Sequence, residues 1–201
     1  MKRVVVASNN PGKLREFAAL LAPLGIEAVA QAELGIDEAE EPHRTFIENA
    51  LEKARHASAR SRLPAMADDS GICVPALGGA PGVYSARYAG EPKSDQRNNA
   101  RLIEAVRHLE KRDAFYYCAL VLVRDPDDPR PIIADASWHG ELVLEARGTG
   151  GFGYDPYFWL PELQCTSAEL PAEHKNRISH RGQALAALVE KLRAEMVFDH
   201  D

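Results

Sequence analysis

The first 24 residues constrain the fold most, because a short apolar run is followed at once by a polar turn and a helical pattern. Residues 2–7 are apolar and rich in β-branched side chains, which predicts a buried strand. Residues 8–12 (Ser-Asn-Asn-Pro-Gly) have the composition of a turn. From Lys13, apolar side chains recur at helical spacing as far as Leu24. A strand, a tight polar turn and a helix in this order open α/β folds, so we expect an α/β protein.

Short strands and capped helices follow one another through the rest of the chain. Thr45 and Glu48 form a capping box for a helix that should end near Arg60. Residues 64–67 have the pattern of a strand that stops at Asp68, and residues 72–93 are rich in Gly and Pro. A last helix should begin near Ser179. The remaining segments predict a helix capped by residue 94 or 95 and an antiparallel meander of strands at 115–123, 131–138 and 141–145, with a turn at 139–140.

Charge and composition limit the classes of function. The formal net charge is −6, whereas nucleic-acid-binding proteins usually carry a basic face. The predicted helix with Arg97, Arg101 and Arg107 also has Glu104 and Glu110, so we expect no nucleic-acid partner. A small anionic ligand is still compatible, because local charge sets the potential of a pocket. No run approaches the roughly 18 apolar residues of a membrane span and the N-terminal apolar run is too short for a signal peptide, which predicts a cytoplasmic protein without a membrane partner. Nothing marks a linker between domains, so we expect one domain over residues 1–201.

The turn before the first helix is a candidate for phosphate binding. Backbone amides at a helix N-terminus bind anions, Gly12 allows close approach, and Lys13 adds a full charge. The segment is not a Walker A loop, because the glycine spacing and the following Ser or Thr are missing. The alternative interpretation is a simple polar turn with a lysine at the start of the helix.

Acidic residues in two places are candidates for a magnesium site. Asp68 and Asp69 follow the predicted strand and could hold Mg²⁺ or orient a water molecule. Any of Glu38, Glu40 and Glu41 could supply a second ligand. The alternative for both groups is a solvated turn or face.

Two later segments have residue types that suit a purine base. In residues 150–156 (Gly-Gly-Phe-Gly-Tyr-Asp-Pro), aromatic rings on a glycine-rich loop could stack on a base and Asp155 could contact its polar edge. Lys175, His180 and Arg181 offer donors to exocyclic oxygens. A tight corner with two core aromatics and a plain helix cap are the structural alternatives. Together the segments supply a phosphate cradle, carboxylates for a metal, stacking rings and base-directed donors, which a nucleoside-triphosphate site requires.

Five ordered motifs make the chain resemble the inosine/xanthosine triphosphate pyrophosphatase (Ham1-like) family over roughly residues 2–193. They are Ser8-x-Asn10-x-x-Lys13, Ala67-Asp-Asp-Ser-Gly71, Leu77-Gly-Gly-Ala-Pro-Gly-Val-Tyr-Ser-Ala-Arg87, Gly150-Gly-Phe-Gly-Tyr-Asp-Pro156 and Ser179-His-Arg-Gly-Gln-Ala-Leu185. The first motif often reads Thr-Gly-Asn in the family, and here the hydroxyl and the second asparagine remain. The resemblance implies an elongated mixed sheet flanked by helices, two lobes with a cleft between them, and a homodimer. It also implies hydrolysis of ITP, dITP and XTP to the monophosphate and pyrophosphate, which cleanses the nucleotide pool.

The same resemblance implies a role for each matching residue. Asp69 would be the catalytic proton acceptor, with Asp68 beside it. Asp69 and Glu41 would hold Mg²⁺, with Glu40 as the alternative to Glu41, and Lys53 is a further candidate for phosphate charge. The substrate-binding residues would be Ser8, Asn9, Asn10, Pro11, Gly12 and Lys13 for the triphosphate, and Ser70, Phe152, Gly153, Tyr154, Asp155, Lys175, His180 and Arg181 for the rest of the nucleotide.

Three other functions are weighed against this one. A Maf-like pyrophosphatase that favours pyrimidine or methylated nucleotides shares the general architecture, but residues 151–153 and 179–181 argue against it. A non-catalytic nucleotide sensor would lack the acidic pair, which is present as Asp68 and Asp69. A nucleic-acid-binding module would need a basic helix face. The dimer surface is placed, as a hypothesis, on residues 72–93 and the neighbouring helices.

Overall fold

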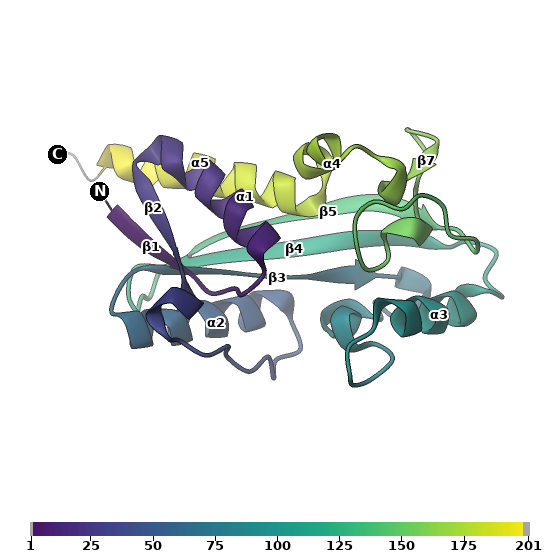
Figure 1. The fold of residues 1–201 in the computed structure, drawn as a ribbon, viewed down its shortest axis with the longest axis horizontal. Helices are drawn as coiled ribbons and strands as arrows, with labels where there is room; N and C mark the ends of the chain where they lie inside the picture. Colours follow the sequence, from purple (N-terminus) through teal and green to yellow (C-terminus); the bar gives the residue numbers. More distant parts are fainter. Residues whose placement is uncertain (1, 199–201) are drawn as a thin grey trace. The chain divides into compact units, whose positions relative to one another are not determined.

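A computed structural model describes residues 2–198 and confirms an α/β fold built on a mixed sheet (Figure 1). Seven strands lie in the order β2-β1-β3-β4-β5-β6-β7. β1 (Lys2–Val6) pairs in parallel with β2 (Ile26–Ala30) and with β3 (Ala65–Cys73). β6 (Phe158–Leu160) pairs antiparallel with β5 (Ile132–Leu142) and with β7 (Cys165–Thr166). β4 (Asp113–Val123) completes the sheet between β3 and β5.

The principal helices are α1 (Pro11–Leu21), α2 (Phe46–Ser61), α3 (Asp95–Val106), α4 (Ala172–Ile178) and α5 (His180–Phe198). Side chains of Asn10, Thr45 and Ser94 accept amide hydrogen bonds at the N-termini of α1, α2 and α3, as their residue types favour. Half of the predicted capping box is confirmed, since the amide of Glu48 donates to Thr45 Oγ1 over 3.2 Å. The Glu48 carboxylate accepts from the Thr45 hydroxyl over 2.6 Å, where a capping box would have it accept from the Thr45 amide. No helix within residues 2–198 is long and apolar enough to cross a membrane.

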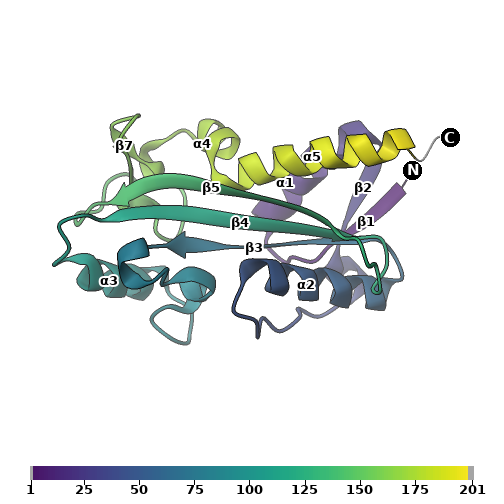
Figure 2. The same ribbon diagram turned by 180° about the vertical axis from the view of Figure 1, so that it is seen from behind.

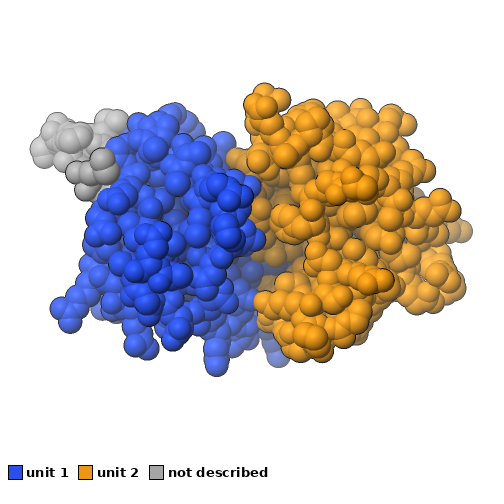
Figure 3. Space-filling model, in the orientation of Figure 1, with its two compact units in different colours: residues 1–69, 119–135, 183–201 blue, residues 70–118, 136–182 orange. Residues whose placement is uncertain are grey.

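The chain divides into two compact units (Figure 3). Unit 1 comprises residues 1–69, 119–135 and 183–201, and unit 2 comprises residues 70–118 and 136–182. By their bounds, β3, β4 and β5 each contribute residues to both units. The single two-lobed domain and the cleft that the resemblance implies stay predictions.

Small side chains form the core of unit 1. Ala50, Ala54 and Ala57, spaced as on one face of a helix, are fully buried where α2 packs on the sheet. They contact valines and alanines of β1, β3 and β4. Figures 1 and 2 show α2 on one face of the strands and α1 and α5 on the other. Side chains this small let α2 approach β3 closely.

Aromatic side chains dominate the core of unit 2. The ring of Phe158 lies 4.7 Å from that of Tyr116 and 5.3 Å from that of Trp138, measured between centroids. Leu102 and Val106 bring the apolar face of α3 against this cluster. α3 and α4 lie on opposite faces of the strands of unit 2 (Figures 1 and 2).

Two strand boundaries predicted from turn residues are wrong. β3 does not stop at Asp68 but continues to Cys73, because it has a neighbouring strand on each side and is buried along most of its length. β5 likewise continues through residues 139–140 to Leu142, so the predicted turn and the separate strand at 141–145 are wrong. A side chain at Gly140 would place its Cβ 2.5 Å from the backbone oxygen of Trp159, so glycine here permits the close approach of β6 and not a turn. Helix α4 and strand β7 were not predicted.

Candidate functional site

Asp69 is a buried carboxylate of β3, in unit 1. The Asn49 side chain on α2 donates from Nδ2 to Asp69 Oδ2 over 3.2 Å, and Lys53 Nζ lies 3.8 Å from Oδ1. The pKa of Asp69 is raised to about 6, chiefly because the carboxyl group is buried. Lys53 and Asn49 act to lower this pKa, and Glu41 and Asp68 act to raise it. A carboxylate with a pKa near neutrality is suited to accept a proton at physiological pH.

Lys53 links Asp69 with Glu41. Its Nζ lies 2.6 Å from Glu41 Oε1, and its side chain is 14% exposed. Burial by itself lowers the pKa of Lys53, but the carboxylates of Asp69, Asp68 and Glu41 outweigh burial and raise it. Lys53 is therefore a cation held between the carboxylates of Glu41 and Asp69.

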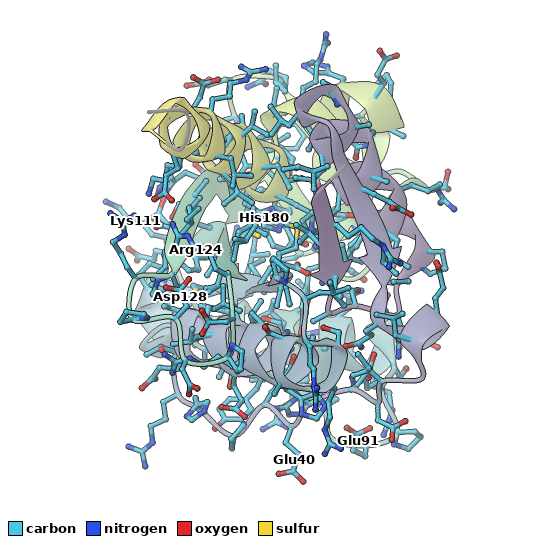
Figure 4. The ribbon with its side chains drawn as sticks, turned by 90° about the vertical axis from the view of Figure 1, so that its left-hand side faces the viewer. Glu40, Glu91, Lys111, Arg124, Asp128 and His180 are labelled. Carbon is cyan, nitrogen blue, oxygen red and sulfur yellow. The ribbon has the colours of Figure 1, made fainter. Side chains whose placement is uncertain are left out.

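Glu41, and not Glu40, is directed toward this group. Glu40 is exposed and projects from the lower edge of the molecule in Figure 4. Within residues 2–198, no cluster of three or more His, Cys, Asp or Glu side chains forms a metal cage. Mg²⁺ binds through one or two carboxylates and completes its shell with water and phosphate oxygens. Asp69 and Glu41 fit this ion, because both are oxygen donors and their charge already attracts the ammonium of Lys53.

Asp68 faces away from Asp69. Adjacent residues of a strand point to opposite faces of the sheet, and Asp68 pairs with Lys13 of α1, whereas Asp69 pairs with α2. Lys13 Nζ lies 3.0 Å and 2.8 Å from the two carboxylate oxygens of Asp68, whose side chain is 1% exposed. The two neighbouring aspartates thus occupy two environments and do not form the side-by-side pair that the sequence suggested.

Side chains of the turn before α1 accept hydrogen bonds from three of its backbone amides. Asn10 Oδ1 accepts from the amides of Gly12 (2.8 Å) and Lys13 (3.2 Å), and Ser8 Oγ accepts from the amide of Asn10 (3.2 Å). Pro11 has no amide hydrogen. Asn9 Oδ1 accepts from the buried Gln31 side chain over 3.3 Å. The amide cradle expected for phosphate is therefore occupied by side chains in this conformation, and the charged group of the turn is Lys13.

Asp155 is the centre of a hydrogen-bond network in unit 2. Its side chain is 4% exposed and pairs with Lys175 Nζ. Oδ2 also accepts from the amide of Phe152 (2.8 Å), while Oδ1 accepts from Ser167 Oγ (2.9 Å) and Tyr116 Oη (3.4 Å). Gly151 has a positive φ of 73°, and a Cβ at this position would lie 2.0 Å from Asp155 Oδ2. Asp155 thus holds the loop in place, and its predicted contact with the base stays a prediction.

The two aromatic residues of residues 150–156 differ in exposure. Phe152 is 61% exposed, and Lys175 Nζ lies 5.0 Å from its ring centroid. Tyr154 is buried and donates from its hydroxyl to the backbone oxygen of Ser85 over 2.7 Å. The ring available for stacking on a base is therefore that of Phe152, while the ring of Tyr154 belongs to the core.

His180 and Arg181, at the start of α5, are buried. The ring of His180 stacks on Tyr116 with centroids 4.8 Å apart and an interplanar angle of 8°. Figure 4 shows His180 in the interior. Arg181 Nη2 donates to Ser70 Oγ over 3.4 Å. The structure thus brings two pairs of predicted substrate residues together, Ser70 with Arg181 and Asp155 with Lys175, and Tyr116 connects Asp155 with His180.

Comparison with known proteins identifies the family. Residues 4–191 match the Ham1 family, which is nearly the whole chain. The chain belongs to the Ham1 family. A dITP/XTP pyrophosphatase of Ralstonia nicotianae is 65% identical over 196 residues, covering 96% of this chain and 98% of the relative. A dITP/XTP pyrophosphatase of Nitrosomonas europaea is 62% identical over 192 residues, covering 96% and 95%.

Solved structures of Ham1 proteins have the same fold. A HAM1 protein from Coxiella burnetii superposes with a TM-score of 0.94 at 44% identity, covering 96% of this chain and all of that chain. The Ham1 protein of Staphylococcus aureus gives a TM-score of 0.89 at 37% identity, with the same coverage. The resemblance and the fold class predicted from the sequence are confirmed, and membership of the Ham1 family excludes the Maf-like alternative.

Sequence reasoning missed the residues that hold two of the candidate site residues, Asp69 and Asp155, in place within their units. Asn49 donates to Asp69, and Tyr116 and Ser167 donate to Asp155. One signal was present for Asn49, because it lies beside Ala50 and one turn before Lys53 and Ala54, on a helix face that must be buried. A polar residue at such a position usually has a specific hydrogen-bond partner.

Proposed function

We propose that this chain hydrolyses the non-standard purine nucleoside triphosphates ITP, dITP and XTP to the monophosphate and pyrophosphate. The full-length identity to dITP/XTP pyrophosphatases supports this reaction. The observation that carries it is Asp69, a buried carboxylate with a pKa raised to about 6 and a lysine 3.8 Å away. Hydrolysis of these nucleotides prevents their incorporation into DNA and RNA.

The residues of unit 1 act on the triphosphate in this proposal. Asp69 accepts the proton of the water molecule that attacks the α-phosphorus. Lys13 and Lys53 supply positive charge to phosphate oxygens, for which each exchanges part of its ion pair with a carboxylate of the protein. Asn49 keeps the carboxylate of Asp69 oriented through its hydrogen bond. Phosphoryl transfer depends mainly on such positioning and charge neutralisation, because it needs little covalent chemistry from the protein.

Magnesium is the metal we propose for this site, with Glu41 and Asp69 as its protein ligands. When bound, the ion neutralises charge on the phosphate oxygens. Glu41 is released for this role when Lys53 turns from it toward a phosphate. Glu40 has no part in the site, since it is exposed and points outward (Figure 4).

The residues of unit 2 select the base in this proposal. Phe152 stacks on the purine, and Lys175, His180 and Arg181 donate hydrogen bonds to its exocyclic oxygens. Adenine has an amino group where hypoxanthine and xanthine have the 6-oxo group, so the donors would stay unpaired. Each unpaired buried donor costs about 1–3 kcal/mol, so a few are sufficient for strong selection.

A substrate panel tests the proposed function. Pyrophosphate release is measured from ITP, XTP and dITP beside ATP, GTP and TTP, with and without Mg²⁺. We expect fast, magnesium-dependent release from the first three substrates. Equal turnover of all purine triphosphates would exclude the proposed selectivity, and release from none would favour the nucleotide sensor.

A matched pair of variants tests the metal ligand. Glu41→Gln removes the carboxylate beside Lys53, whereas Glu40→Gln changes an exposed neighbour. We expect the magnesium concentration for half-maximal activity to rise about tenfold or more in E41Q and to be unchanged in E40Q. An equal effect of both changes would contradict the assignment of Glu41.

The location and the assembly belong to the same proposal. We propose that the enzyme acts in the cytoplasm as a homodimer, with residues 72–93 at the dimer surface. Light scattering tests the assembly, since one subunit has a mass of 22.1 kDa. A single subunit in solution would exclude the homodimer.

A further inference from the structure

We infer that Asp95 and Asn99 of α3 are positioning residues that fix the orientation of Phe152 for the purine base. The inference rests on the proposed function, in which Phe152 stacks on the base. Its starting point is that both residues bind the peptide groups of Gly153, directly after Phe152.

Gly153 is held through both of its polar backbone groups. Its N–H donates to Asp95 Oδ2 over 2.8 Å, and its carbonyl oxygen accepts from Asn99 Nδ2 over 2.9 Å. Residues 95 and 99 lie four apart on α3, so their side chains share one face of the helix. Gly153 has a φ of 61°, a conformation that other residues rarely adopt. The two hydrogen bonds therefore lock a backbone geometry that the glycine makes possible.

Phe152 is fixed from its other side by Asp155, which accepts from the Phe152 amide over 2.8 Å. The peptide groups before and after Phe152 thus each have a defined partner, and these partners set the direction of its side chain. The ring itself is 61% exposed, with Lys175 Nζ 5.0 Å from its centroid. An exposed ring on a fixed backbone loses less conformational freedom when it stacks on a ligand.

The first turns of α3 form a rigid support for this contact. Ser94 caps the helix. Asn98, which is 2% exposed, donates to the carbonyl oxygen of Ala86 over 3.0 Å and accepts from the amide of Ala89 over 2.7 Å. Asp95 and Asn99, on either side of this buried anchor, are more exposed than Asn98. Changes at Asp95 and Asn99 should therefore affect the loop more than the global fold.

Steady-state kinetics with ITP tests the inference. Asn99→Ala and Asp95→Ala should each raise KM about tenfold and change kcat less than about twofold, because the affected contact binds the base equally in the ground and transition states. Asp95→Asn keeps an acceptor and should remain near the wild type, whereas Asn99→Asp places an acceptor against the Gly153 carbonyl and should raise KM at least as much as N99A. Gln96→Ala, an exposed change on the same turns, is the matched control and should have no effect.

Product inhibition distinguishes weaker binding of the base from weaker binding of the phosphates. Inhibition by inosine monophosphate should weaken in N99A as much as KM rises, while inhibition by inorganic pyrophosphate should be unchanged. Equal weakening by both products would overturn the inference. Thermal melting of N99A within a few degrees of the wild type excludes a general loss of structure, and D95A provides a second variant.

A double-mutant cycle with Phe152→Ala decides whether Asn99 acts through the ring. Removing a positioning residue should have little effect when the residue that it positions is absent. We expect N99A to raise KM about tenfold in the wild type and less than about twofold in F152A. If N99A raised KM equally in F152A and in the wild type, the inference would be overturned and the proposed function would stand. An F152A enzyme with a normal KM for ITP would overturn the proposed stacking role as well.

Discussion

Asp69 of unit 1 and Asp155 of unit 2 are both buried carboxylates, but their surroundings differ in kind. Asp155 accepts from Lys175, Ser167, Tyr116 and a backbone amide. Asp69 accepts from Asn49 and has Lys53 3.8 Å away, with the negative charges of Glu41 and Asp68 nearby. Hydrogen-bond donors around a buried carboxylate stabilise the folded structure. Burial close to other negative charges instead raises the pKa of the carboxyl group. Asp69 is therefore suited to take up a proton, while Asp155 holds a loop in place.

The cores of the two units match these roles. The alanine face of α2 lets this helix lie close to β3, which brings Asn49 and Lys53 to Asp69. The aromatic core of unit 2 places Tyr116 against both Asp155 and His180. Small side chains thus bring charges together in unit 1, and large rings support the candidate base-binding residues in unit 2.

The largest effect should come from removing Asp69, the proposed proton acceptor of unit 1. Asp69→Asn keeps the shape of the side chain but cannot take a proton, so kcat for ITP should fall about 10²–10⁴-fold. Pyrophosphate release at saturating ITP and Mg²⁺ measures the change. A D69N enzyme with more than a tenth of the wild-type kcat would show that Asp69 is not the proton acceptor, and the proposed contrast with Asp155 would then fail.

The same substitution in unit 2 should damage the fold. Asp155→Asn takes the negative charge away from Lys175 and turns an acceptor into a donor, so the free energy of unfolding should fall by about 2–4 kcal/mol. Urea denaturation measures the loss. Asp113→Asn, at an exposed position of the same unit, is the control and should be nearly neutral. A D155N protein as stable as D113N would contradict the structural role of Asp155.

The exposed ring of unit 2 should contribute to binding without contributing much to stability. Phe152→Ala should raise KM for ITP about tenfold, since stacking of an aromatic side chain on a base contributes about 1–3 kcal/mol. Its thermal midpoint should stay close to that of the wild type, because the ring is 61% exposed. Phe158→Ala, a fully buried ring in the same unit, should instead destabilise the protein by about 3–5 kcal/mol. A large loss of stability in F152A would place its ring in the core.

Local patterns were sufficient to predict much of this arrangement. The caps of α2 and α3 and the strand β1 follow from short stretches of sequence, because their hydrogen bonds and apolar spacing are local. The ordered motifs identified the family. The course of β3 through Asp68 and Asp69 was not predictable in this way, since strands from distant parts of the sequence override the turn preference of these residues.

Local sequence patterns also could not predict the hydrogen-bond partners of the site residues. The contact of Asp155 with Tyr116 joins residues 39 apart, and that of Asn49 with Asp69 joins residues 20 apart. The sequence identified Asp155 as polar and near aromatic residues, which suits contact with a base as well as it suits a buried network. Only the packing of unit 2 shows that protein donors surround this carboxylate.

The smallest effect, and the sharpest for Asp69, concerns the pH dependence of stability. The pKa of Asp69 rises from 3.8 to about 6 in the folded protein, so between these pH values the folded state binds a proton that the unfolded state releases. The contribution of Asp69 to stability must therefore fall as pH rises from about 4 to 6 and stay constant above this range. D69N lacks this titration, so its melting temperature in EDTA should gain a few degrees on the wild type across that window. Because all other groups titrate in both proteins, a difference in melting temperature that is constant from pH 4 to 7 would mean that Asp69 is as well satisfied as Asp155.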